Sequence, residues 1–383
     1  MSEALAHYFD YNATSPLLPA AREALLAALD EGYGNPSSAH GPGRAARTIV
    51  EAARAEVAAL AGVVVDEVVF TSGATEALTQ ALYAHGPGRV VATSLEHPAL
   101  GGAVRALGER SLVTVSAGLQ SPPAGPLAAA ALVADMLSAA GDEPSLLALM
   151  ASHNVTGLVL PVEMLAQQRI GSQHRLLVDA SQHAGRLPLE PLFAGPGRPD
   201  YAVLAPHKFG GPRGIGALIV APGAPRRSLF PGGGQERGMR GGTEAVPLIA
   251  AFGAAARVAR LNREAEAARL AALRDALAAR LAAETGVAVV GADAARLPQT
   301  LCIIVPRHTD GETVVARMSR AGFALSAGSA CATGSALPSP GLLALGLSPA
   351  DAIRTVRISL GAFTTSAAVD ALGTALIGIL REV

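Results

Sequence analysis

A lysine beside a glycine-rich turn and an acid at the end of an apolar run carry the clearest chemistry in this sequence. Lys208 precedes the glycine-dense turn 209–214, and Asp179 ends the run Leu176–Val178, with Gln182 three residues further on. A lysine amine can condense with an aldehyde, and a carboxylate can keep a pyridine nitrogen protonated so that the ring accepts electrons. The combination predicts a site for pyridoxal phosphate.

A run of small residues upstream could hold the phosphate of such a cofactor. The segment Thr71–Glu76 follows the apolar run Val68–Phe70 and opens a helical pattern. Small residues let backbone N–H groups approach an anion at a helix N-terminus, and Thr75 adds a hydroxyl. A capped helix start without a ligand would have the same sequence. The hypothesis therefore depends on this loop occurring in order with Asp179 and Lys208.

A second glycine-rich run covers Gly232–Thr243 and contains Arg237 and Arg240. The run is too long for a simple turn. It indicates close backbone approach to a ligand or to a neighbouring subunit, and the alternative is a flexible surface loop.

Two further residues could act on a substrate. Cys331 lies among Ser, Ala and Gly residues that offer little apolar bulk, so we expect an exposed and reactive thiol, whereas Cys302 belongs to the apolar run 301–305 and is expected in the core. Arg357 stands within the apolar run 356–361. Its guanidinium needs a partner, either a substrate carboxylate held by two hydrogen bonds or an internal salt bridge.

Composition excludes several other classes of function. The chain has 383 residues, half of them hydrophobic, and a formal net charge of −1. No block of one charge sign occurs, which argues against nucleic-acid or membrane-surface binding. Two distant cysteines form neither a disulfide framework nor a metal cluster and favour a reducing cytoplasm. We expect no signal peptide in the first ten residues and no membrane span.

Short apolar runs alternate with helical patterns along most of the chain. The runs are continuous rather than alternating, as in strands buried on both faces, and predict a doubly wound α/β fold with a parallel or mixed sheet. The expected strands are Val68–Phe70, Val90–Thr93, Val113–Val115, Leu146–Met150, Leu176–Val178, Ala202–Leu204 and Ala217–Val220, and the helices include Ala45–Leu60, Glu76–Ala84 and Leu127–Ala139.

The pattern changes near Phe252, where a second, smaller α+β domain is expected. A long helix is predicted over Ala254–Glu284, with an apolar stripe of leucines that favours a connecting helix packed on a core over a coiled coil. The stripe consists of Leu270, Leu273, Leu277 and Leu281; the strands Val287–Val290 and Thr300–Val305 and the helices Glu312–Ala321 and Ala367–Arg381 follow.

These residues together resemble the cysteine desulfurase family, in the class V aminotransferase group of fold type I pyridoxal phosphate enzymes. The resemblance covers nearly the whole chain. It is carried by Tyr8–Thr14, Gly34–His40, Thr71–Glu76, Glu96-His97, Asn154–Gly157, Asp179–Gln182, His207-Lys208, Gly232–Thr243, Cys331 and Arg357–Thr365. It implies a large cofactor-binding domain over residues 14–257 and a small domain formed by 1–13 and 258–383.

The resemblance also implies residue roles. Lys208 would form the Schiff base, His97 would stack on the pyridine ring and assist proton transfer, and Cys331 would be the nucleophile that becomes a persulfide. Asp179 would bind the pyridine nitrogen and Gln182 the phenolic oxygen. The phosphate would be held by Ala74, Thr75 and His207, with Thr243 supplied by the partner of a homodimer. The substrate carboxylate would be held by Asn154 and Arg357, and Asn154 would also bind the cofactor.

The implied function is removal of sulfur from L-cysteine, giving alanine and sulfur for an acceptor protein in iron–sulfur cluster or thio-cofactor synthesis. Three positions depart from the family pattern: Val155 replaces an acid, Ala205 a phosphate-binding serine, and Ala362 an arginine. The alternatives are a selenocysteine lyase, another class V lyase or transaminase, and a non-catalytic homologue that keeps the cofactor pocket.

Overall fold

The computed structural model describes residues 3–328 and 338–382, which form two β-sheets with helices packed around them. The larger sheet has seven strands in the order β1-β7-β6-β5-β4-β2-β3, and only β7 runs against its neighbours. Its strands are β1 (Val68–Thr71), β2 (Gly88–Thr93), β3 (Arg110–Val115), β4 (Ser145–Met150), β5 (Arg175–Asp179), β6 (Tyr201–Leu204) and β7 (Gly216–Val220). The predicted mixed α/β sheet is confirmed.

Alternate residues of these strands pack on opposite faces, because side chains alternate along a strand. Leu147 and Leu149 of β4 face one core, whereas Leu146 and Ala148 face another. The helices that supply the two layers are α2 (Pro19–Glu31), α3 (Gly41–Ala61), α4 (Ala74–His85), α5 (Pro98–Leu107), α6 (Ala129–Ala140), α7 (Val162–Gln168) and α8 (Glu190–Phe193). Burial on both faces explains the continuous apolar runs.

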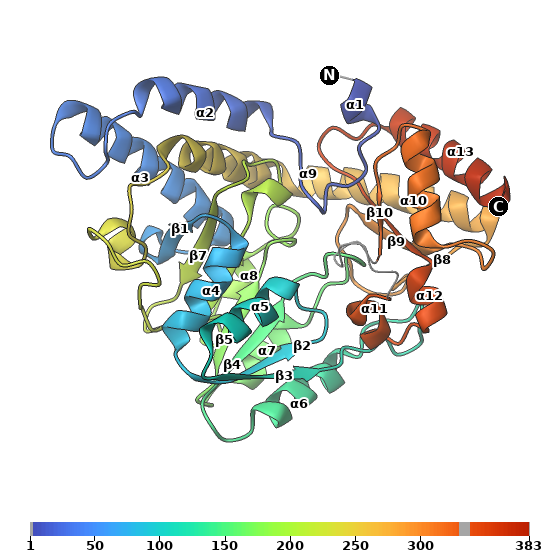
Figure 1. Ribbon diagram of the computed structural model, residues 1–383, viewed down its shortest axis with the longest axis horizontal. Helices are drawn as coiled ribbons and strands as arrows, with labels where there is room; N and C mark the ends of the chain where they lie inside the picture. The colour runs from blue at the N-terminus through green and yellow to red at the C-terminus, as the bar shows by residue number, and fades with distance from the viewer. Residues whose placement is uncertain (1–2, 329–337, 383) are drawn as a thin grey trace.

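The smaller sheet is antiparallel, in the order β10-β11-β9-β8. Its strands are β8 (Ala288–Val289), β9 (Thr300–Ile304), β10 (Ser326–Ala327) and β11 (Thr355–Ser359), and its helices are α10 (Gly311–Arg320), α11 (Pro340–Ala344), α12 (Pro349–Ile353) and α13 (Ser366–Glu382). The short α1 (Glu3–Ala6) precedes the first bridge, between Tyr8 and Ala324. The N-terminus therefore adds to this smaller sheet, and Figure 1 shows both chain ends on its side of the molecule.

The long helix α9 (Val246–Thr285) joins the two parts and packs on α2, α3 and α13 (Figure 1). Leu270, Leu277 and Leu281 are buried against the smaller sheet, which confirms the predicted stripe. The predicted start at Ala254 was wrong by eight residues, since Val246–Gly253 is a helical segment so apolar that it shows no polar face. The two separate cores support the division into 14–257 and 1–13 with 258–383, which stays a prediction.

Two other expected boundaries differ from the structure. The expected strand Val287–Val290 shortens to β8, because only Ala288 and Val289 pair with β9. The helix expected from Ala45 begins at Gly41, where the His40 ring accepts a hydrogen bond from the Gly43 N–H at 3.2 Å and caps the helix.

Candidate active site

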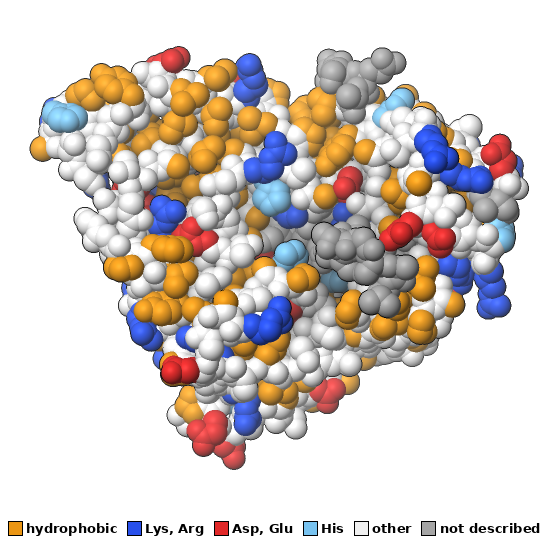
Figure 2. Space-filling view, in the orientation of Figure 1, with side chains coloured by type: hydrophobic (Ala, Val, Ile, Leu, Met, Phe, Trp, Pro, Cys, Tyr) orange, Lys and Arg blue, Asp and Glu red, His pale blue; other side chains and the backbone are white. Residues whose placement is uncertain are grey.

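A cavity of about 580 Å³ lies at the carboxyl ends of β1, β4, β5 and β6, on the side that faces β10 and β11. Ligands of open α/β sheets bind at this edge. The lining includes Ala74, Thr75, His97, Asn154, Asp179, Gln182, His207, Lys208 and Arg357. Figure 2 shows histidine and Lys or Arg side chains near the middle of the view, between the two parts of the molecule.

The structure thus brings together nine residues that the sequence singled out from six separate segments. Two others are not part of this group. Thr243 is exposed and does not line the cavity, and Cys331 lies outside the described residues.

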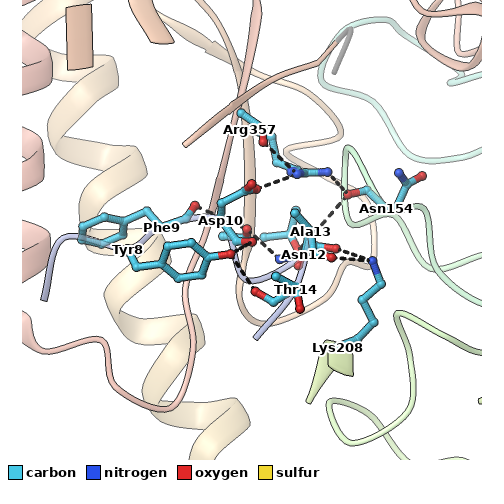
Figure 3. Close-up of polar contacts among 12 residues, drawn as sticks. Tyr8, Phe9, Asp10, Asn12, Ala13, Thr14, Asn154, Lys208 and Arg357 are labelled. Atoms are coloured by element: carbon cyan, nitrogen blue, oxygen red, sulfur yellow. Dashed lines mark hydrogen bonds and ion pairs between the residues drawn. The ribbon is translucent and has the colours of Figure 1, made fainter. Parts of the chain in front are cut away.

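Lys208 is held in a short turn, η2 (Pro206–Lys208), directly after β6. Its Nζ donates hydrogen bonds to the carbonyl oxygens of Asn12 and Ala13, each at 2.9 Å (Figure 3). Its own carbonyl oxygen accepts from Ser15 Oγ at 2.8 Å and from Arg186 Nη2 at 2.9 Å. Both the amine and the backbone of Lys208 are therefore fixed by contacts from outside the turn.

The glycines after Lys208 are required by close packing. Gly210 has a φ of 94°, and a Cβ there would lie 2.4 Å from Leu18 Cγ; a Cβ at Gly211 would lie 2.4 Å from Pro206 Cβ. A side chain at either position would push the turn out of place. The glycine-dense sequence around the lysine is thus a packing requirement.

Asp179 is the last residue of β5, Gln182 lies three residues beyond it, and both line the cavity. Asp179 Oδ1 accepts from the Ser181 N–H at 2.9 Å, and Gln182 Nε2 donates to the Asn12 carbonyl oxygen at 2.9 Å. Ser181 also lines the cavity, and its buried Oγ has no hydrogen-bond partner among the described residues. A buried hydroxyl without a protein partner fits a cavity built for a polar ligand.

The small-residue segment Ser72–Thr75, here called a loop, covers the link from β1 to α4 and the first two residues of α4, as the sequence predicted. Strand β7 passes so closely that a Cβ at Gly216 would lie 2.7 Å from Gly73 Cα. His207 Nδ1 lies 3.2 Å from Thr14 Oγ1. Burial lowers the pKa of His207 to about 4, with further lowering by Lys208 and Arg213, so its ring is neutral near pH 7.

Arg357 is 4% exposed and makes an internal ion pair, the alternative that the sequence left open. Its Nη2 donates to Asp10 Oδ1 at 2.6 Å and to Ser326 Oγ at 3.1 Å, and its Nη1 donates to the Asn154 carbonyl oxygen at 3.1 Å (Figure 3). Its buried Nε has no hydrogen-bond partner in the described part of the chain. One edge of the guanidinium is thus held in place while Nε keeps a donor for another group.

Sequence reasoning assigned no role to Asp10 or Asn12, although both lie in the motif Tyr8–Thr14. Asn12 is 2% exposed, and its side-chain amide donates to the Asn154 carbonyl oxygen and to Thr300 Oγ1. The backbone carbonyl oxygen of Asn12 accepts one hydrogen bond from Gln182 Nε2 and another from Lys208 Nζ. The sequence signal that could have found them is the motif Tyr8–Thr14 itself, in which they are the acid and the amide.

The acid–histidine pair Glu96-His97 stands at the start of α5. His97 Nδ1 accepts from the Ala99 N–H at 3.2 Å, so the proton of the neutral ring is on Nε2. Loss of surrounding water lowers the pKa of His97, Asp179 opposes this shift and Lys208 adds to it. The His97 ring therefore lies within the influence of both the Asp179 carboxylate and the Lys208 amine.

Glu96 Oε1 joins the ends of two strands, accepting from Met150 N and Thr93 Oγ1, each at 2.9 Å. Loss of water around the carboxyl group raises the pKa of Glu96 to about 8. The hydrogen bond from the Met150 N–H lowers this pKa, and the negative charge of Asp179 raises it further. Glu96 is thus protonated at neutral pH in the folded chain.

Together these features fit pyridoxal phosphate. The cavity offers an amine, a carboxylate, a loop of backbone N–H groups at a helix N-terminus and an unpartnered buried hydroxyl. Among the described residues, no group of three or more His, Cys, Asp or Glu side chains could hold a metal ion. Within residues 3–328 and 338–382, no helix has the length and apolar character needed to cross a membrane.

The shift at Glu96 predicts a pH dependence of stability. Because its folded pKa is raised, the stability linked to its proton is complete below pH 4.5 and is lost as the pH rises through about 8. We therefore compare the melting temperature of cofactor-free Glu96→Gln with that of wild type. The difference, variant minus wild type, should be larger at pH 9 than at pH 5. Scanning calorimetry at both values checks this, with exposed Glu23→Gln as the control. Parallel profiles for wild type and Glu96→Gln would refute the shift.

Comparisons with known proteins agree with this site. The family model for class V aminotransferases matches residues 7–372. A cysteine desulfurase of Cereibacter sphaeroides is 38% identical over 95% of this chain and 93% of its own, and the cysteine desulfurase IscS of an Anaeromyxobacter strain is 37% identical over 95% and 89%.

Solved structures show the same fold. A NifS-like protein has a TM-score of 0.86 at 29% identity over 98% of this chain and 99% of its own. The protein SspA in complex with cysteine has a TM-score of 0.75 at 27% identity, over 94% and 100% of the two chains. The chain therefore belongs to the class V aminotransferase family, as a pyridoxal-phosphate-dependent enzyme of its cysteine desulfurase group.

Proposed function

We propose that this enzyme takes sulfur from L-cysteine as a persulfide on Cys331 and releases L-alanine. The observation that supports it most is the convergence of Lys208, Asp179 and Arg357 on one cavity in a chain whose relatives are cysteine desulfurases. The cysteine held by SspA supports the same substrate. The transferred sulfur would serve an acceptor protein, for iron–sulfur clusters or thio-cofactors, as the IscS relative suggests.

The cofactor would be held by residues from every wall of the cavity. Lys208 would form the covalent link, Asp179 would pair with the pyridine nitrogen, and Gln182 would reach the phenolic oxygen with its second amide hydrogen. The backbone at Ala74, the hydroxyl of Thr75 and the His207 ring would hold the phosphate. These assignments are supported by the presence of all six residues in the cavity lining.

When bound, the cofactor withdraws electrons from the substrate carbon that carries the amino group. His97 would stack on the ring and move a proton at Nε2, since Nδ1 is committed to the Ala99 N–H. Lys208, once released, would return its amine to the carbonyls of Asn12 and Ala13. These carbonyls would keep the freed amine beside the reacting carbon.

Sulfur transfer would then need only one thiolate. Cys331 sulfur forms a bond to the substrate sulfur, the carbon–sulfur bond breaks, and its electron pair stays with the carbon, which takes up a proton. The product is alanine and the Cys331 persulfide. Such a thiol must stay reduced between turnovers, which favours the reducing cytoplasm expected from the sequence.

Asn154 and Arg357 would hold the substrate carboxylate. The buried and unpartnered Nε of Arg357 supports this role, because it leaves a charged donor for a carboxylate while Asp10 fixes the other side of the guanidinium.

Arg357→Gln should raise the KM for L-cysteine by about tenfold to a hundredfold, because a charge-assisted hydrogen bond to the carboxylate is lost. Steady-state kinetics of the holoenzyme measure it. Arg354→Gln is the matched control, since Arg354 pairs with Asp351 outside the cavity. If the KM is unchanged and the cofactor absorbance is intact, Arg357 does not bind the substrate carboxylate and serves only in the ion pair with Asp10.

We further propose a homodimer in which Thr243 of one chain reaches the phosphate bound by the other. Exposed hydrophobic side chains support an interface: Leu29 on α2, Tyr33 just beyond it and Phe230 beside the glycine-rich run are 55%, 75% and 50% exposed. Figure 2 shows hydrophobic side chains gathered at the upper left, over α2. Sedimentation of the holoenzyme should give twice the chain mass; a monomer at micromolar concentration would contradict the proposal.

Cys331→Ala should abolish both sulfide release and the transfer of labelled sulfur from L-cysteine to the protein. Cys302→Ala is the control and should keep both, because Cys302 is buried in β9 and burial raises the pKa of its thiol to about 12. Labelled L-cysteine followed by a non-reducing gel measures the transfer, and an alanine assay measures turnover.

The same assay separates the other candidates. Continued alanine formation in Cys331→Ala would indicate a lyase without a persulfide step, including a selenocysteine lyase when selenocysteine is supplied. No turnover in a wild-type protein that carries its cofactor would indicate a non-catalytic homologue.

A further inference from the structure

A carboxylate stands beside the loop proposed to hold the phosphate. Glu76 lies in the first turn of α4, lines the cavity, and its side chain is 8% exposed. Its Oε2 accepts from the Ser72 N–H at 2.8 Å, within the loop Ser72–Thr75. Glu76 thus uses one of the N–H groups of this loop and brings negative charge to it.

Negative charge here opposes the binding of a phosphate dianion, because like charges a few ångströms apart repel strongly at a partly buried site. Other positive groups do not pair with this carboxylate: the His207 ring is neutral near pH 7, the Lys208 amine is directed to the carbonyls of Asn12 and Ala13, and Arg213, which lines the cavity, is exposed to water that screens its charge. The charge of Glu76 must be balanced by another group.

Arg240 provides that balance. Its Nε donates to Glu76 Oε1 at 3.1 Å, and its side chain is 29% exposed. It belongs to the glycine-rich run Gly232–Thr243, whose purpose neither the fold nor the cavity lining explains.

The run that carries Arg240 is held rigidly. Glu236 and Arg237 have φ values of 47° and 55°, the left-handed region that side chains other than glycine rarely adopt. The buried Glu236 carboxylate holds this conformation through Arg54 Nη1 and Nη2, at 2.7 and 2.8 Å, and through the Phe70 N–H of β1 at 2.8 Å. The strained backbone is therefore fixed to the strand that leads into the phosphate loop.

We infer that Arg240 is a positioning residue for the cofactor phosphate: by neutralising Glu76 it lets the loop Ser72–Thr75 accept a dianion, and so selects the phosphorylated form of the cofactor. The inference rests on the proposed phosphate position. It gives the glycine-rich run a role within its own chain, separate from the role proposed for Thr243 across an interface.

The test compares two cofactor forms that differ only in the phosphate. Cofactor-free full-length protein is titrated with pyridoxal phosphate and with pyridoxal, and binding is followed by absorbance. Arg240→Gln should weaken pyridoxal phosphate binding about tenfold, the order expected for one unneutralised charge near a protein surface, and leave pyridoxal binding unchanged. Arg240→Lys should stay close to wild type.

The decisive variant adds Glu76→Gln to Arg240→Gln. Glutamine can still accept from the Ser72 N–H, so removal of the carboxylate charge should restore pyridoxal phosphate binding. Arg237→Gln is the matched control: Arg237 lies in the same run and pairs at 2.8 Å with Asp66, whose side chain is 75% exposed. It should change neither affinity.

Four results would overturn the inference. Equal weakening of both cofactor forms in Arg240→Gln, or failure of Glu76→Gln to restore binding, would show that Arg240 only supports the fold. Thr75→Val removes one hydroxyl proposed to bind the phosphate. This variant distinguishes a failure of the inference about Arg240 from a failure of the proposed phosphate position. If Thr75→Val weakens only pyridoxal phosphate and Arg240→Gln does not, this inference alone fails; if neither variant discriminates between the two forms, the proposed phosphate position fails with it.

Discussion

The hydrogen bonds of the buried Asn12 are the contact on which the rest of the site depends. Its side chain joins Asn154 to Thr300 of β9, and its backbone carbonyl receives Gln182 and Lys208. Its N–H donates to Ser359 Oγ of β11 at 3.0 Å. One residue thus connects both sheets, and a shift of one sheet against the other would move Lys208 and Gln182 together.

The same N-terminal segment reaches the substrate side of the cavity through Asp10. A buried guanidinium without a counter-charge is strongly unfavourable, and the Asp10 carboxylate removes that penalty for Arg357. The carboxylate also aligns the guanidinium, because both Asp10 and Ser326 are bonded to the same Nη2. The Asp10–Arg357 ion pair therefore stabilises the fold and also orients the guanidinium that would bind a substrate carboxylate.

Electrostatic pairing extends to the other end of the cavity. Glu236 ties the glycine-rich run to Arg54 of α3 and to the Phe70 N–H of β1, before the loop Ser72–Thr75, and Arg240 ties it to Glu76, after the loop. Loss of water lowers the pKa of His207, which lines the cavity, and of the buried His153 and His183 to about 4, so these three rings add no positive charge near pH 7. Two of the charged groups that line the cavity, Arg357 and Glu76, are ion-paired with Asp10 and Arg240, and each pair joins segments distant in the sequence.

The sequence by itself determined the fold class and the seven strands of the larger sheet, and it singled out Lys208, Asp179 and Gln182 as candidate site residues, with His97 added by the family resemblance. Burial on both faces of a sheet leaves continuous apolar runs, and reactive side chains stand out at their ends. Only the tertiary structure decided that Arg357 pairs with Asp10, that Asn12 holds Lys208, and that Arg240 meets Glu76. Each of these contacts joins residues more than 150 positions apart, and no local pattern records a partner that only folding brings near.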